Sequence, residues 1–192
     1  LEAISKGLNA TIFRIGDLSS RYSDGHFQNN ISENAIYSRL KSLVEISAIP
    51  DSILDNDLEF TPVDFASKAL VKIIWSNNGL NRIFHIYNPN TITTKSLLNY
   101  MDTLGYNIKV ISEKDFMNLV KSISTDEINQ YKIIGIINDF TKNNDMIYNH
   151  IIKEDNYITC KYLNSLGFYW PDLNYDYFKM LIKYMQDVGF IK

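Results

Sequence analysis

The sequence predicts an α/β fold for residues 1–111 and a mostly helical C-terminal subdomain for residues 112–192. Residues 10–15 form a β-branched, mostly apolar run directly after Gly7, which is the pattern of a buried parallel strand that follows a helix. Residues 82–87 form a second such run and end at an Asn-Pro-Asn turn. After residue 111 the apolar positions recur at helical spacing. We therefore expect strands that alternate with helices in a parallel sheet, followed by a helical cap.

The polar segment 16–25 leaves the carboxyl end of the first predicted strand. Open parallel sheets bind ligands outside this end of their strands, so a ligand is expected there. Thr61 is the expected N-cap of a helix that begins with Pro62, and Ser112 is the expected N-cap of a later helix. The helical patterns cover residues 1–6, 27–47, 62–76, 93–104, 112–122, 124–138, 157–166 and 174–187, with short strands at 58–61 and 108–111.

Composition limits the partners and the compartment. The 192 residues are 45% hydrophobic with a net charge of −3, so the chain offers no basic surface for nucleic acid. No apolar run reaches the ~18 residues of a membrane span and no signal peptide is visible, so a soluble, cytoplasmic protein is expected. The single cysteine, Cys160, excludes an intrachain disulfide, and its apolar surroundings predict a buried residue rather than a catalytic thiol. The chain opens on Leu1 within a helical pattern, so we expect it to be part of a longer polypeptide.

The common signatures of catalytic and cofactor sites are missing from the sequence. Neither a G-x-G-x-x-G turn nor a phosphate-binding P-loop occurs, and no G-x-S-x-G motif supplies a nucleophile. The histidines are too isolated to form a metal site. The acidic residues near the middle of the chain are expected to lie in a solvated loop. The histidines are His26, His85 and His150, and the acidic residues are Asp51, Asp55, Asp57 and Glu59.

Several stretches in order resemble the thioester reductase domains that terminate nonribosomal peptide synthetases. These stretches are GLNATIFRIGDL at 7–18, RYSDG at 21–25, EFTPVD at 59–64, FHIYNP at 84–89, YLNSLGFYWP at 162–171 and GFI at 189–191. The resemblance implies the C-terminal remnant of a Rossmann-like, extended short-chain dehydrogenase fold with a helical substrate-binding subdomain. It implies NADPH as cofactor in the full domain, and a peptidyl carrier protein with a phosphopantetheine thioester as partner. The product would be an aldehyde or an alcohol.

The resemblance also implies that the catalytic groups lie upstream of this chain. The family's proton donor is a Tyr assisted by a Lys four residues later, on the helix whose end corresponds to residues 1–6. Lys6 has no Tyr four residues before it, so the helical pattern at residues 1–6 does not supply the pair, and the sequence also lacks the glycine-rich cofactor turn. We therefore expect the isolated chain to be inactive, not to bind NADPH alone, and to need an upstream Rossmann half of the same polypeptide.

By resemblance, the turn after the first strand would pass beside the nicotinamide end of the cofactor, and the following segment would line the substrate channel. The alternatives are a simple tight turn and ordinary packing. Related sequences often have Asn-Leu-Thr-Gly where this one has Asp-Leu-Ser-Ser. Thr61 and Asp64 are expected to cap and brace a helix. The predicted cofactor-side residues are Ile15, Gly16, Asp17 and Leu18, and the predicted substrate-side residues are Arg21, Phe27, Asn30 and Arg39.

Two other functions stay open from the sequence. The first is a module that docks a carrier protein without its own catalysis, and association with a holo-carrier in the absence of cofactor would identify it. The second is part of another extended dehydrogenase, such as a nucleotide-sugar epimerase, which a test with nucleotide sugars would identify. The aromatic residues of the tail are predicted to be core or, in part, an exposed carrier-binding patch. They are Tyr162, Phe168, Trp170, Tyr177, Phe178 and Tyr184.

Overall fold

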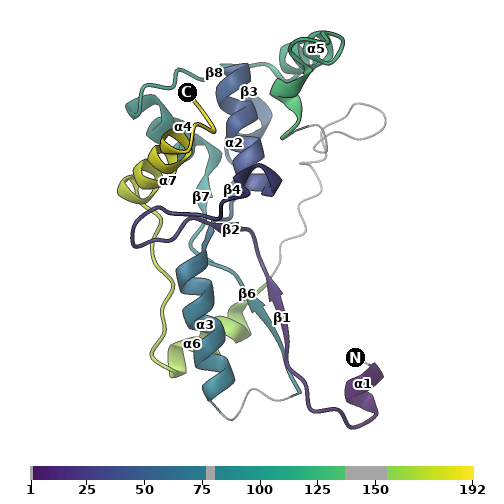
Figure 1. Cartoon of the computed structure of the whole chain (residues 1–192), viewed down its shortest axis with the longest axis vertical. Coiled ribbons are helices and arrows are strands. Elements are labelled where there is room, and N and C mark those ends of the chain that lie inside the picture. The colour runs from purple at the N-terminus through teal and green to yellow at the C-terminus, as the bar shows by residue number, and fades with distance from the viewer. Residues whose placement is uncertain (1, 77–80, 137–154) are drawn as a thin grey trace.

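The computed structural model describes residues 2–76, 81–136 and 155–192 (Figure 1). The helices are α1 (Glu2–Ser5), α2 (Ala35–Ile46), α3 (Val63–Trp75), α4 (Thr94–Thr103), α5 (Glu113–Ser124), α6 (Tyr157–Ser165) and α7 (Tyr175–Asp187), with the 3-10 turns η1 (Ile31–Glu33), η2 (Asp51–Ile53) and η3 (Gln130–Ile133). The strands are β1 (Ile12–Ile15), β2 (Leu18–Ser19), β3 (Ala48–Pro50), β4 (Asp57–Leu58), β5 (Thr61–Pro62), β6 (Ile83–Ile86), β7 (Ile92–Thr93) and β8 (Lys109–Ile111).

The strands form short, mostly parallel ladders. β1 pairs with β6 in parallel, with Ile12 opposite Ile83 and Ile15 opposite Ile86. β2 and β5 are also parallel, as are β3 and β8, whereas β4 and β7 are antiparallel. Helix α3 connects β5 to β6, as expected for strands that alternate with helices. The predicted α/β class with a helical C-terminal portion is confirmed.

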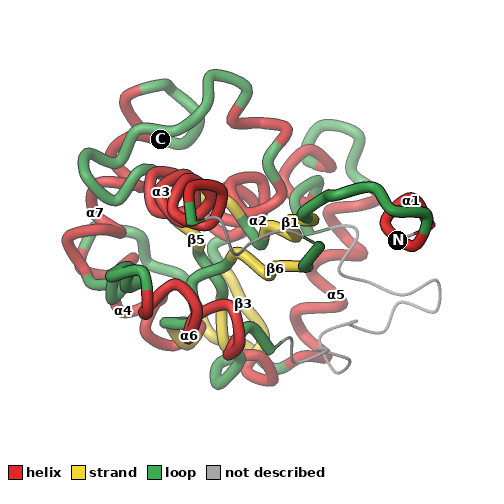
Figure 2. The backbone as a smooth tube through the Cα atoms, turned by 90° about the horizontal axis from the view of Figure 1, so that it is seen from below, coloured by secondary structure: helices red, strands yellow, loops and turns green. Residues whose placement is uncertain are grey.

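The elements gather in two parts of an elongated molecule (Figure 1). The lower part holds β1 and β6 with α3 and α6, and the upper part holds α2, α4 and α7 beside β3 and β8. Figure 2 looks along α3 from below and shows β1 and β6 side by side. The hydrophobic residues form three clusters, which we call the α2–α4–α7 core, the α3–β6–α6 core and the β3–α5–η3 core.

Helical periodicity explains the two longest helices. In α3 the buried residues Ala66, Ala69 and Ile73 recur on one face, which packs against β6. In α7 the Asn174 side chain accepts the backbone N–H of Tyr177 and so caps the helix. The buried face of α7 contributes Tyr177, Phe178, Leu181, Ile182 and Met185 to the α2–α4–α7 core.

Two predicted helices were wrong in extent. The helix expected over 27–47 begins at Ala35, because the Asn34 side chain accepts the N–H of Tyr37 and caps it there. The helix expected over 124–138 is absent from 125–136, apart from the η3 turn. Asp126 accepts the backbone N–H of Ile128 at 3.0 Å, and such local side-chain bonds compete with helix formation. Residues 137 and 138 lie outside the described part of the chain.

Candidate functional site

The turn after β1 is held tightly against neighbouring segments. The N–H of Gly16 donates to the carbonyl of Ile86 at 3.0 Å and so continues the ladder by one residue. A Cβ added to Gly16 would lie 2.6 Å from the Cβ of Tyr87 and closer still to the Glu59 carboxylate. Packing against Glu59 and Tyr87 therefore requires glycine at this position.

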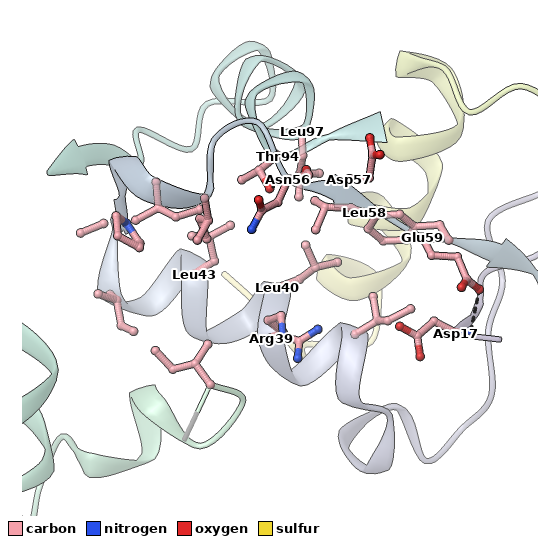
Figure 3. Close-up of a pocket in the computed structure, with 18 of the residues that line it drawn as sticks. Asp17, Arg39, Leu40, Leu43, Asn56, Asp57, Leu58, Glu59, Thr94 and Leu97 are labelled. Atoms are coloured by element: carbon pink, nitrogen blue, oxygen red, sulfur yellow. Dashed lines mark hydrogen bonds between the residues drawn. The ribbon is translucent and has the colours of Figure 1, made fainter. Parts of the chain in front are cut away.

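Glu59 links three segments at the carboxyl ends of the strands. Its Oε1 accepts the backbone N–H of Asp17 at 2.8 Å (Figure 3). The same oxygen accepts the hydroxyl of Thr61 at 2.9 Å. The Thr61 hydroxyl oxygen in turn accepts the backbone N–H of Asn88 at 2.9 Å. The predicted role of Thr61 as a helix N-cap is wrong, because Pro62 occupies the N-cap of α3 and the Thr61 hydroxyl is used in this network.

The two edges of the β1–β6 ladder differ. Two residues of the α6 region cap the outer edge of β6. The Asn156 side chain donates to the Tyr87 carbonyl at 2.7 Å, and the Thr159 hydroxyl accepts the His85 N–H at 3.1 Å. Among the described residues no strand pairs with the opposite edge of β1. Within the described part of the chain, the edge of β1 is therefore the one available to a further strand.

A buried hydroxyl network fixes the chain after the turn. Tyr37 of α2 accepts the backbone N–H of Ser20 at 2.8 Å and shares a hydrogen bond with its hydroxyl at 2.5 Å. Tyr177 of α7 donates to the Ser19 hydroxyl at 2.7 Å. Burial raises the pKa of both tyrosines above the ordinary value, so both stay protonated at neutral pH. The network ties β2 to α2 and α7.

A cavity of about 290 Å³ lies between α2 and the β3–β4 segment. Leu40 and Leu43 project into it from α2, and Leu58 lines it from β4 (Figure 3). Arg39 projects from α2 on the side of Asp17 and Glu59, the two residues that line the cavity near the turn after β1 (Figure 3). The full lining is Asp17, Ile36, Arg39, Leu40, Leu43, Ile46, Ala48, Ile49, Pro50, Ile53, Asn56, Asp57, Leu58, Glu59, Phe60, Thr94, Leu97, Phe116 and Ile136.

Comparison with curated proteins gives two similar relatives, and no family model matches the chain. A 121-residue stretch, 62% of the chain, is 30% identical to a glycine betaine reductase of Emericella nidulans and covers 9% of it. A 125-residue stretch, 65% of the chain, is 23% identical to one of the linear gramicidin synthase subunits of Brevibacillus parabrevis and covers 2% of it. The chain therefore matches a small part of these curated relatives.

Solved structures match over the full length of the chain. A thiolation–reductase di-domain from an archaeal nonribosomal peptide synthetase aligns with 100% of the chain at 26% identity and a TM-score of 0.82. The resemblance to thioester reductase domains is confirmed. The terminal R domain from the myxalamid PKS-NRPS pathway shows the same fold, with 21% identity and a TM-score of 0.82 over 100% of the chain. The chain covers 39% and 47% of these two proteins, so it spans less than half of each.

The predicted cofactor-side residues are contiguous, from the last residue of β1 through the turn to the first residue of β2. Ile15 is 44% exposed and Asp17 is exposed, so both present side chains to the surroundings of the turn. Gly16 is packed against Glu59 and Tyr87, and Leu18 is half-buried opposite Thr61 in the β2–β5 pair. The outward-facing groups of this turn are therefore the side chains of Ile15 and Asp17.

The predicted substrate-side residues fall into two places. Arg39 lines the cavity, together with Asp17 of the turn. Arg21 forms an exposed ion pair with Asp24 at 2.6 Å, and Asn30 donates to Glu33 at 2.6 Å. The ring of Phe27 stacks on Tyr37 with centroids 4.5 Å apart. Arg39 and Asp17 thus line the same cavity, and the other three predicted residues lie outside its lining.

Sequence reasoning missed Glu59 and the two network tyrosines. Glu59 was expected in a solvated acidic loop, but it is half-buried and accepts two hydrogen bonds, whereas Asp51, Asp55 and Asp57 are exposed. No local signal identifies Glu59, because carboxylates are mostly exposed and its partner Asp17 lies 42 positions away in the sequence. Tyr37 and Tyr177 find their partners across the fold, and nothing in their local sequence indicates this.

The remaining sequence expectations concern metals, membranes and the cysteine. The described residues hold no cluster of His, Cys, Asp and Glu that suits a metal ion, and His150 lies outside them. None of the described helices is long and apolar enough to cross a bilayer. Cys160 is half-buried, and desolvation raises the pKa of its thiol. The neutral thiol is therefore favoured, which argues against a nucleophilic role.

Proposed function

We propose that this chain is the substrate-side portion of an NADPH-dependent thioester reductase domain, which releases a carrier-bound acyl or peptidyl thioester as an aldehyde or alcohol. The main support is the match to the thiolation–reductase di-domain over 100% of the chain. The cavity also lies where this function needs a substrate site, beside the carboxyl end of a parallel strand.

The turn after β1 is proposed to border the nicotinamide end of the cofactor. NADPH supplies the hydride, and the protein supplies orientation and a proton. In this chain the exposed Ile15 side chain offers an apolar surface for a planar ring. Gly16 and Leu18 hold the turn rather than face outward, and the Glu59 carboxylate fixes the Asp17 backbone at 2.8 Å. The turn is therefore rigid, as positioning of a ring requires.

Arg39 is proposed to contact the polar part of the substrate. It lines the cavity on the side of Asp17 and Glu59, so its guanidinium lies near the expected reacting end. A guanidinium donates hydrogen bonds to carbonyl oxygens in a fixed geometry, which suits the orientation of a thioester or amide. Arg21, Phe27 and Asn30 lie on the connection that leads from the turn to α2, and we assign them to the outer part of the channel.

The open edge of β1 is the proposed junction with an upstream Rossmann half of the same polypeptide. The Asn156 side chain, just before α6, occupies the far edge of the ladder at β6, and no described strand pairs with the edge of β1, which supports a junction there. The glycine-rich cofactor turn is assigned to that half because no G-x-G-x-x-G occurs in this sequence. The catalytic Tyr/Lys pair is assigned to it because the resemblance places that pair on the helix that ends at residues 1–6, whereas the Tyr-x-x-x-Lys spacings of this chain, at 37–41, 157–161 and 175–179, lie on other helices. A peptidyl carrier protein is the proposed donor of the thioester.

The proposal is tested by NADPH oxidation with a carrier-bound acyl thioester. This chain alone is compared with a longer polypeptide that also includes the upstream half. We expect turnover only in the longer polypeptide. Turnover by the short chain would show that its own residues supply the catalytic groups. Carrier binding without turnover in either polypeptide would overturn the reductase proposal in favour of a docking module.

A further inference from the structure

The cavity beside α2 lies where two separate hydrophobic cores meet. Ile36 and Leu40 in its wall belong to the α2–α4–α7 core. Ala48, Phe116 and Ile136 in its wall belong to the β3–α5–η3 core. Among the described residues the apolar side chains of this wall face a space that no other side chain fills, and an apolar guest would add contacts to them.

The lining changes in character from one end to the other. Asp17 and Glu59 contribute charged groups beside the turn after β1 (Figure 3). Arg39 on α2 and the opposite wall, with Asn56, Asp57 and Thr94, add further polar groups along the cavity (Figure 3). The residues contributed by β3, α5 and residue 136 are apolar, and they include Ile49, Pro50 and Phe116. Polar groups of a ligand would lose their hydrogen bonds at this second end, whereas a hydrocarbon chain would lose none. The cavity therefore distinguishes a polar head from an apolar tail.

The size of the cavity limits the tail. Its volume of about 290 Å³ is close to the ~300 Å³ at the lower end of ordinary ligand pockets. A whole peptide does not fit in such a space, whereas a short aliphatic chain does. We propose that the cavity binds an aliphatic acyl or side-chain group next to the thioester carbonyl. The carbonyl itself would lie at the Asp17–Glu59 end. This inference rests on the proposed reductase function for the identity of the head group.

The inference is tested with S-alkyl pantetheine thioethers, which mimic the substrate but cannot be reduced. Titration calorimetry with this chain measures the dissociation constants of the methyl, propyl and pentyl compounds. We expect each added methylene to tighten binding about fourfold, the equivalent of ~0.8 kcal/mol of burial, until the cavity is full. Equal affinity for the three compounds, or no binding of any, would overturn the inference.

Variants locate the binding to the cavity. Leu43→Trp fills it from α2 and Leu58→Trp fills it from β4, and either should abolish the dependence on chain length. Glu45→Trp places the same ring on α2 outside the cavity lining and should leave the dependence unchanged. Circular dichroism checks that each variant is folded. If either Leu43→Trp or Leu58→Trp does not fold, the binding data of the other variant test the inference. Retention of the length dependence in a folded filling variant would contradict the inference.

Reduction assays with the longer polypeptide separate this inference from the proposed function. Length-dependent binding without thioester reduction would leave the apolar site in place and reject the reductase function. Reduction with no preference among acetyl, butyryl and hexanoyl thioesters would support the function and reject the aliphatic site.

Discussion

Replacement of Gly16 by alanine tests whether protein packing fixes the turn after β1. The new Cβ would lie 2.6 Å from the Cβ of Tyr87. This distance is 0.8 Å shorter than 3.4 Å, the shortest ordinary van der Waals distance for a Cβ. Overpacking of this kind costs about 1–3 kcal/mol. The Glu59 carboxylate would also have to move, and its bonds to Asp17 and Thr61 are worth about 1 kcal/mol together at this half-buried site. We expect the free energy of unfolding to fall by about 3 kcal/mol.

Urea denaturation measures this loss of stability. A double-mutant cycle with Glu59 then shows how much of the loss comes from the clash with the Glu59 carboxylate. In a Glu59→Ala background the carboxylate clash is removed and the contact with Tyr87 remains. The cost of Gly16→Ala should therefore fall by about 1 kcal/mol in that background without reaching zero. A cost below about 1 kcal/mol in the original background would refute the argument, because the turn would then have free space at this position.

The other stability predictions concern the buried tyrosines and the edge of β6. Tyr37→Phe leaves a buried backbone N–H unpaired and should cost about 1–3 kcal/mol in urea denaturation, whereas the half-buried Tyr184→Phe should cost less. Equal costs would contradict the network. Because burial raises the pKa of Tyr37 and Tyr177, the unfolded chain loses their protons first as the pH rises above about 10. Stability should therefore fall above that pH by up to ~1.4 kcal/mol per pH unit for each tyrosine, and a flat profile would count against the burial. Asn156→Ala removes the bond to the Tyr87 carbonyl and should cost about 1–2 kcal/mol, with faster hydrogen exchange in β6 as a second measure.

The parts of the fold that depend on local pattern could be predicted from the sequence. The Ser112 side chain accepts the N–H of Asp115 and begins α5, as expected, and the apolar runs at 12–15 and 83–86 are paired strands. The burial predicted for the first of these strands is wrong, because the first two residues of β1 are half-buried and the last two are exposed. The helical pattern expected over 93–104 corresponds to α4, which Thr93 caps by accepting the N–H of Ser96. These features depend on residues within four positions of one another, or on hydrophobicity alone.

The parts that depend on distant contacts could not be predicted. Strand β3, at 48–50, comes shortly after α2 and is a strand because it pairs with β8. Ala48 lies opposite Lys109, which is 61 positions later in the sequence. The site also joins distant segments, since Glu59 meets Asp17 across 42 positions. Local sequence indicated a turn at 16–18 and an acidic residue at 59, but not that they touch. The cofactor and substrate roles of the turn and of Arg39 remain predictions.

The central claim is that this chain forms part of a domain that transfers a hydride from NADPH to a carrier-bound thioester. The most direct test uses NADPH that carries deuterium at the transferred position of its nicotinamide ring, with the longer polypeptide and an acyl carrier protein. Mass spectrometry of the released compound then follows the label. We predict an aldehyde with one deuterium on the former thioester carbon, or an alcohol with two after a second reduction. Release of an unlabelled carboxylic acid would contradict the claim, because it would show hydrolysis without hydride transfer.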